Sequence, residues 1–142
     1  MKVAILLFLS AFAGGCVTDP VREMNLKVLV TAPDIVDIPK AEKYANALAS
    51  ITGMRMSFNS TVSGNRVLDS IYRMEFVPVE GTNIKVAVEC AVAETTLFVT
   101  IEGDIESAAA LNVSKRAQEL AKNYFPNSRL VLFKRYHSLF GP

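Results

Sequence analysis

The sequence has few of the residue types from which most enzyme active sites are built. It contains one histidine, two cysteines and no tryptophan among 142 residues, and its seven glycines form neither a phosphate-binding loop nor a nucleophile elbow. His137 would have to serve any histidine-dependent catalysis, and a tetrahedral zinc site would need carboxylates to complete its ligand set. We therefore expect no metal, no cofactor and no catalytic centre, so that the protein is not an enzyme.

Long hydrophobic runs are also absent. The longest run, residues 3–13, has eleven residues and is broken only by Ser10. A membrane-spanning helix needs about 20 apolar residues, whereas the hydrophobic part of a secretory signal needs only about 7–15. Lys2 supplies a short positive segment before the run. We interpret this stretch as a signal peptide, and no second run of this kind follows it.

Small residues at positions 13–15 lead directly from this run into Cys16. This ending resembles the lipobox of bacterial lipoprotein precursors, with Ala13 in place of the commoner leucine. The resemblance covers the signal alone, and it implies a signal peptide over residues 1–15 and lipidation of Cys16 by fatty acyl chains such as palmitate. Two or more such chains hold a protein durably on a bilayer. The alternative is an ordinary secreted protein in which Cys16 has no special role.

The residues after Cys16 bear on location. Residues 16–24 are expected to form a short polar tether, which spans roughly 30 Å at most when extended, and residues 25–142 are expected to form one domain. In lipoproteins of this type an aspartate after the cysteine retains the protein in the inner membrane, so Val17 implies the periplasmic side of the outer membrane if the source has two membranes. This location in the cell envelope excludes nucleic acid as a partner.

Hydrophobic periodicity predicts two helices and six strands. One helix has Pro39 in its first turn and ends before Gly53, with Ile51 in its apolar stripe, and the other spans residues 106–125 with Asp104 as its cap. Met54, Met56 and Phe58 are expected to share a core-facing side of one strand, and Cys90 is expected to face the core from another. The predicted strands are residues 25–31, 54–59, 71–79, 84–92, 97–102 and 130–136.

The order of these elements predicts the fold class. A strand, a helix, four strands, a helix and a strand form an α+β two-layer sandwich, with both helices on one face of a mostly antiparallel sheet of five or six strands. The leading topology is ferredoxin-like, a split βαβ arrangement with an extra hairpin. Such folds carry many unrelated activities, so the fold does not indicate a function.

Charge is unevenly distributed along the chain. Residues 106–142 hold six basic and two acidic side chains, whereas residues 16–105 hold eight basic and twelve acidic ones. This asymmetry predicts contact with an anionic surface or a partner. The alternative is a solvated helix face beside an edge strand protected by its charges. The six candidate residues are Lys115, Arg116, Lys122, Arg129, Lys134 and Arg135.

The leading functional hypothesis is a non-catalytic envelope lipoprotein that acts as a partner-binding or assembly accessory. It would be attached to the membrane through Cys16 and would bind an unknown envelope protein, for which an open sheet edge is suited. One alternative is a periplasmic module that binds a small molecule or lipid in a pocket lined by Tyr44, Met56, Phe58 and Tyr124. The third hypothesis is an envelope hydrolase that uses His137.

The lipobox generates the first testable prediction. The Cys16→Ser variant should lose its acyl chains and leave the membrane fraction without unfolding, because the tether lies outside the predicted core. Intact-mass measurement of the wild-type protein and the variant checks this outcome. An unmodified Cys16 in the wild-type protein, or a chain cut several residues away, would contradict the lipoprotein interpretation.

Overall fold

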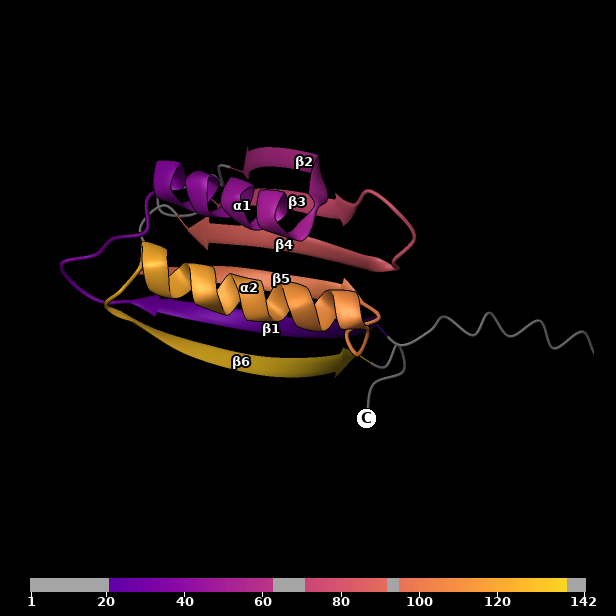
Figure 1. Ribbon diagram of the computed structural model, residues 1–142. Coiled ribbons are helices and arrows are strands. Elements are labelled where there is room, and N and C mark those ends of the chain that lie inside the picture. The colour runs from indigo at the N-terminus through magenta and orange to yellow at the C-terminus, as the bar shows by residue number, and fades with distance from the viewer. Residues whose placement is uncertain (1–20, 63–70, 92–94, 138–142) are drawn as a thin grey trace, which may run out of the picture.

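Six strands and two helices form two layers in the computed structural model, which describes residues 21–62, 71–91 and 95–137 (Figure 1). The predicted fold class, an α+β sandwich with two helices on one face of an antiparallel sheet, is confirmed. The elements in chain order are β1 (Val21–Val30), α1 (Ile38–Thr52), β2 (Met54–Val62), β3 (Ile71–Pro78), β4 (Ile84–Ala91), β5 (Thr96–Gly103), α2 (Ala108–Tyr124) and β6 (Ser128–His137).

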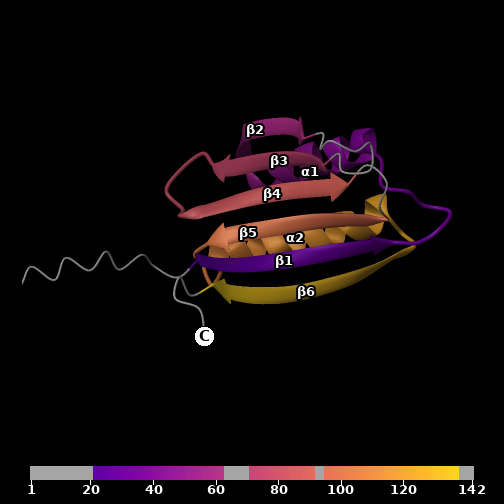
Figure 2. The same cartoon turned by 180° about the vertical axis from the view of Figure 1, so that it is seen from behind.

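The strand order of the sheet is β2-β3-β4-β5-β1-β6, and each neighbouring pair is antiparallel. β1 is therefore inserted between β5 and β6, which are connected to each other through α2. This insertion is the predicted split βαβ arrangement, and the β2–β3 pair is the extra hairpin. Both helices cover one face of the sheet, and the view from behind shows the other face uncovered (Figure 2).

The core lies between the helices and the sheet. The residues of β1 that are buried under the helices, as the alternation in the sequence predicts, are Met24, Leu26, Val28 and Val30. The helices bring small residues to their contact, including Ala41 and Ala45 of α1 and Ala117 of α2. Tyr44 lies between them, and its buried hydroxyl donates a hydrogen bond of 2.7 Å to the backbone carbonyl of Ala117. The ring of Tyr124 packs edge-on against Tyr44 at 5.8 Å.

The ends of the helices follow capping rules that the sequence predicted in part. Asp37 caps α1 by accepting a hydrogen bond of 2.8 Å from the backbone N–H of Lys40, and Gly53 ends this helix with φ of 67°. The prediction that Asp104 caps α2 is wrong. Ser107 is the cap, and its hydroxyl accepts from the N–H of Ala110 at 3.2 Å. Asp104 lies in the preceding turn, where α2 has not yet begun.

β1 begins earlier than predicted. Residues 21–24 were assigned to the tether, but they are the first residues of β1, and Met24 is buried in the core. Their strand conformation is supported by β6, in which His137 lies opposite Val21. The strand could not be recognised from the segment itself, which carries two charged residues in four. Its pairing partner lies more than a hundred residues away along the chain.

A β-bulge changes the side-chain pattern of β2. Met56 lies opposite Phe76, but Phe58 lies opposite Glu75, so that Ser57 is an extra residue in the ladder. Phe58 is therefore on the uncovered face, not on the helix-covered face with Met56. Met56 and Phe58 are 56% and 46% exposed, so the prediction that they share a core-facing side is wrong. β2 also continues to residue 62 instead of ending at residue 59.

Ile51 departs from the predicted apolar stripe of α1. Its side chain is half exposed, whereas Tyr44, Ala45 and Leu48 of the same helix are buried. α1 ends at Thr52, so Ile51 lies in the last turn of the helix. Helical periodicity predicts the apolar face of α1, but it does not predict how far along the helix other elements cover that face.

The two ends of the sheet have different neighbours. The start of β1, the end of β5 and the start of β4 lie at the same end of the sheet, which we call the proximal end. The turn at residues 79–83, between β3 and β4, is also at the proximal end (Figure 1). β1 finishes at Val30, and the connection of residues 31–37 to α1 lies beyond it, at what we call the distal end.

Gly103 should be much less tolerant of substitution than Gly81. Gly103 has φ of 104°, and a β-carbon there would overlap the backbone carbonyl of Asn83, whereas Gly81 has φ of 65° and no atom within 4 Å of such a carbon. We expect Gly81→Ala to lower the free energy of unfolding by about 1 kcal/mol and Gly103→Ala by about 2–4 kcal/mol. Urea unfolding of both variants in the Cys16→Ser background measures the difference, and equal losses would contradict the close approach.

Candidate functional site

The structure gives no side-chain environment for two residues singled out in the sequence, Cys16 and His137. Cys16 and the whole signal segment lie outside the described residues, so lipidation stays a prediction. His137 is the last described residue of β6, where its backbone lies opposite Val21. Among the residues that the structure describes, no three side chains of histidine, cysteine, aspartate and glutamate are grouped closely enough to hold a metal ion.

The six basic residues of the carboxy-terminal segment are divided between the two sides of the sheet. Lys134 lies opposite Met24, whose side chain is buried under α2, so Lys134 is on the helix-covered side. Arg129 and Arg135 lie at alternate positions of β6 and therefore point from the uncovered face. Lys115, Arg116 and Lys122 are exposed on α2. Of the six candidate residues, only those on and beside α2 share one side of the domain, and their contact with an anionic surface or a partner stays a prediction.

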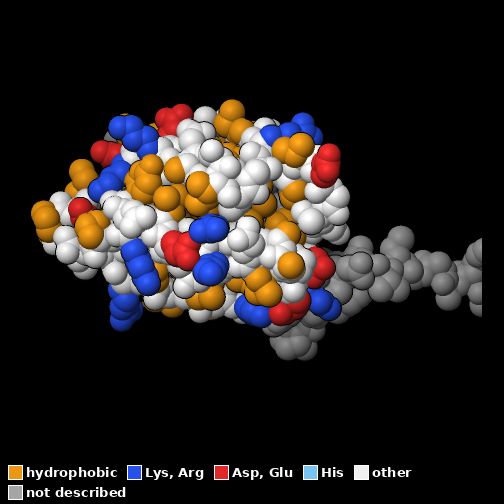
Figure 3. Space-filling model, in the orientation of Figure 1, with side chains coloured by type: hydrophobic (Ala, Val, Ile, Leu, Met, Phe, Trp, Pro, Cys, Tyr) orange, Lys and Arg blue, Asp and Glu red, His pale blue; other side chains and the backbone are white. Residues whose placement is uncertain are grey.

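Acidic partners reduce this charge further. Lys134 forms an ion pair of 2.6 Å with Glu106, and Arg116 forms one of 3.1 Å with Glu119. Figure 3 shows blue and red side chains next to one another over α2 and β6. Exposed pairs of this kind stabilise a protein by about 0–1 kcal/mol. Their main effect here is to leave the helix-side surface mixed in charge instead of uniformly basic.

A groove separates α2 from β6. It has a volume of about 420 Å³, and its apolar floor includes Met24 and Leu132. The ammonium groups on its rim belong to Lys115, Lys122 and Lys134. The carboxylate of Glu119 also lines the groove, so the charge of its rim is mixed. The groove contains none of the four residues that were predicted to line a ligand pocket.

Those four residues do not form a pocket. Tyr44 is completely buried and Tyr124 packs against it, so both belong to the core between the helices. Met56 and Phe58 lie on opposite sides of β2, at the edge of the sheet, because of the bulge. The predicted pocket is therefore absent at these four positions, and the reason is the change of face at Ser57.

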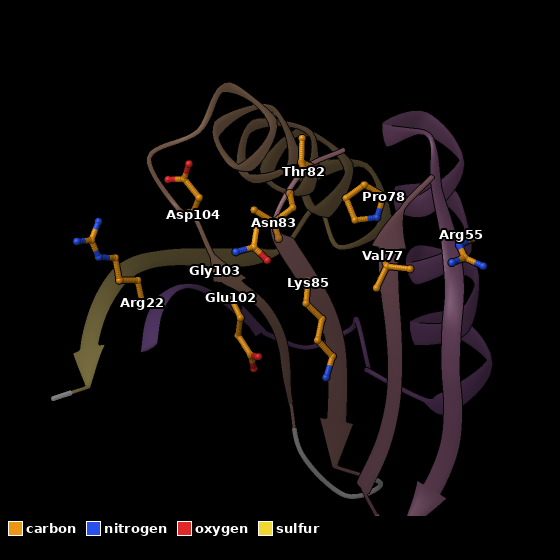
Figure 4. A pocket seen from close by; sticks show the side chains of 11 residues that line it. Arg22, Arg55, Val77, Pro78, Thr82, Asn83, Lys85, Glu102, Gly103 and Asp104 are labelled. Atoms are coloured by element: carbon orange, nitrogen blue, oxygen red, sulfur yellow. The ribbon is translucent and has the colours of Figure 1, made fainter. Parts of the chain in front are cut away.

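A larger hollow lies on the uncovered face at the proximal end (Figure 4). It has a volume of about 890 Å³, and its lining mixes the basic side chains of Arg22, Arg55 and Lys85 with the carboxylates of Glu102 and Asp104. In Figure 4 the side chains of Arg22 and Arg55 lie on opposite flanks of the hollow instead of converging. No pattern in the sequence predicts this hollow, because its residues come from strands that only the sheet register brings together.

Lys85 is already engaged by the sheet. It forms an ion pair of 2.8 Å with Glu75, which also accepts a hydrogen bond of 2.7 Å from Arg73. Burial opposes ionisation of Glu75, but the bonds from Lys85 and Arg73 outweigh it and lower the pKa of this carboxyl. Arg73 also pairs with Glu89 on β4. The charges on this part of the uncovered face therefore satisfy one another.

The two edge strands of the sheet differ in how they meet solvent. β6 carries three charged residues, Arg129, Lys134 and Arg135, and charges of this kind discourage pairing with another strand. β2 has nine residues of which only Arg55 is charged. Its exposed side chains include Met56 and Phe58, one on each face of the sheet. β2 is therefore the edge that is better suited to accept a further strand.

Cys90 is buried, as its alternation predicted. It lies opposite Tyr72 and Leu97 within the sheet and is 1% exposed. Burial, with a smaller contribution from the negative charge of Asp37, raises the pKa of the Cys90 thiol to about 11. The reactive thiolate is therefore scarce at neutral pH, and the sulfur lies out of reach of solvent.

This environment predicts the labelling behaviour of Cys90. In the Cys16→Ser protein, where Cys90 is the single thiol, a disulfide reagent such as Ellman's reagent should react slowly at pH 8 and rapidly once urea unfolds the domain. The absorbance of the released thiol measures both rates. Fast labelling of the folded protein would show that this part of β4 opens readily and would make Cys90 a candidate functional thiol.

The last two properties of the chain concern membrane-spanning helices and likeness to known proteins. No helix among the described residues is long and apolar enough to cross a membrane. No protein-family model matches the sequence, and no relative is found among curated proteins.

Among solved structures, the fold is similar to that of the adenosylmethionine decarboxylase from Aquifex aeolicus VF5. The two structures superpose with a TM-score of 0.50 over 86% of this chain and 94% of the other, at 9% sequence identity. At this identity the likeness concerns the α+β fold alone.

Proposed function

We propose that this chain is a lipid-anchored protein of the cell envelope whose folded domain acts as a non-catalytic partner-binding or assembly accessory. The anchor would be Cys16, and the domain would face the periplasm from the outer membrane if the source has two membranes. The lipobox-like ending of residues 13–16 supports the anchor. The surface of the domain supports partner binding, and one feature of that surface carries the proposal.

That feature is the exposed edge of β2. An edge strand presents backbone N–H and C=O groups that another extended chain can pair with, and proteins usually block such edges with charges. β2 has a single charge, Arg55, over nine residues. It also leaves Met56 and Phe58 about half exposed. A surface of this kind is stabilised when a partner strand covers it.

Because of the bulge, β2 can contact a partner strand on both faces of the sheet. Because Met56 lies on the helix-covered side and Phe58 on the uncovered side, an added strand would contact apolar side chains on both of its own faces. Backbone hydrogen bonds would supply affinity, and these two side chains would select for apolar residues at matching positions of the partner. The partner we propose is therefore an envelope protein with an extended, largely uncharged segment.

The ligand-binding alternative has less support. The pocket expected between Tyr44, Met56, Phe58 and Tyr124 is missing, since two of these residues are in the core and two are at the sheet edge. The groove between α2 and β6 remains, but its floor residue Leu132 is nearly half exposed. A site that buries most of a small ligand needs deeper enclosure than this.

Photo-crosslinking in the native envelope tests the strand-addition proposal. The photoreactive residue p-benzoylphenylalanine should give one discrete adduct when it replaces Phe58, because this side chain borders the open edge of β2. The matched control is Phe133, also an aromatic residue on the uncovered face but on the charged edge strand β6. Gel electrophoresis and mass spectrometry of the adducts measure the result.

A second change links the adduct to the edge. Met56→Lys, introduced beside the photoreactive residue, should reduce the adduct yield about tenfold, which corresponds to about 1.4 kcal/mol, because a lysine on an edge strand opposes pairing. Circular dichroism checks that the fold is retained. Equal adducts at positions 58 and 133, or an adduct that survives Met56→Lys, would overturn the role of β2.

A further inference from the structure

The geometry points to a fixed orientation of the domain: its proximal end rests on the lipid surface, and its distal end points away from the membrane. This inference rests on the proposed lipid anchor at Cys16. It adds the surface by which the folded domain meets the bilayer, and three observations lead to it. They are the length of the chain before β1, the direction of β1, and the apolar residues exposed at the proximal end.

The chain before β1 is short. β1 begins at Val21, so only residues 17–20 separate it from Cys16. Five extended residue steps span roughly 17 Å. The early start of β1 therefore halves the reach expected for a tether ending at residue 24. The proximal end of the sheet must remain within this distance of the acylated cysteine.

The direction of β1 then places the distal end far from the lipid. The ten residues of β1 extend about 30 Å from Val21 to Val30. The turn at residues 79–83 lies at the proximal end, whereas Ile35 lies in the connection beyond Val30 at the distal end (Figure 1). If the domain stands on its proximal end, positions 79 and 35 differ in height by about the length of β1.

The surface of the proximal end on the helix side is suited to a lipid interface. Val79 is 65% exposed and lines a hollow of about 320 Å³ between the end of α1 and the start of α2. Ile51, about half exposed, lies in the last turn of α1 next to Thr52, which lines this hollow, and Leu111, also about half exposed, lies in the first turn of α2 and lines the groove between α2 and β6. Glu80 is the single charged residue in the lining of the hollow beside Val79. Partial burial of such apolar side chains in the interfacial region of a bilayer is favourable.

Two of the six candidate basic residues lie far from the lipid in this orientation, whereas Lys134 and Arg135 lie opposite residues 23–24, near the start of β1. Lys122 is in the last turn of α2 and Arg129 is near the start of β6, so both lie toward the distal end. In the proposed orientation they are far beyond the Debye length of about 8 Å from the headgroups and cannot hold the domain flat on the lipid. The length of the β2 edge then stays accessible to a partner.

The absence of tryptophan provides a direct test. The full-length lipidated protein should be prepared as two variants, Val79→Trp and Ile35→Trp, each with one tryptophan at a site of similar exposure, 65% and 62%. Both would be reconstituted into phosphatidylcholine vesicles with and without bromine at positions 6 and 7 of an acyl chain. Bromine quenches tryptophan fluorescence at short range, so we expect quenching of the Val79→Trp variant to be at least several-fold greater than that of the Ile35→Trp variant.

The controls separate the orientation from the anchor. Intact mass and flotation with vesicles report whether Cys16 is acylated and holds the protein on lipid, and circular dichroism reports whether each variant is folded. Loss of acylation or flotation in the wild-type protein overturns the anchor and this inference with it. If the variants float, equal quenching, greater quenching of Ile35→Trp, or no quenching of either variant overturns the orientation alone.

Discussion

The arrangement of the domain depends on one buried hydroxyl. Tyr44 is fully enclosed between α1 and α2, and its hydroxyl donates to the carbonyl of Ala117. A buried hydroxyl without a partner would destabilise the fold, so this bond fixes the position of one helix against the other. Burial also raises the pKa of Tyr44, so the hydroxyl keeps its proton and stays a donor. With the helices held together, the remaining face of the sheet, its two edges and its two ends are the surfaces through which the domain meets other molecules.

Local patterns in the sequence predicted most of the fold. Some features depend on neighbouring residues alone, and the structure agrees with their prediction. They are the alternation of β1, β4 and β5, the 3.6-residue period of both helices, Pro39 in the first turn of α1 and Gly53 at its end. One prediction failed locally, since Ser107 and not Asp104 caps α2, and others failed where a distant strand decides the outcome. Residues 21–24 are a strand because β6 pairs with them, and Phe58 changes face because its register against β3 shifts. Neither effect leaves a periodic signal in the sequence.

The candidate surfaces were less predictable than the fold for the same reason. The excess of basic residues after position 106 is visible in the sequence, but only the register of β6 against β1 shows that Arg129 and Lys134 point from opposite faces. The contrast between the two edges could have been found from composition, because β2 has one charge and β6 has three. The sequence alone does not show that these two strands are the edges of the sheet, since edge positions depend on the topology.

The insertion of β1 between β5 and β6 has a consequence for the order in which the chain folds. β1 leads the described part of the chain, but its hydrogen-bonding partners are residues 96–102 and 128–137. A chain that emerges amino end first, from a ribosome or a translocation channel, cannot complete the sheet until β6 has appeared. β1 has no strand beside it until β5 has emerged, and its other edge stays open until β6 follows. The topology thus delays completion of the sheet until nearly all of the described residues have emerged.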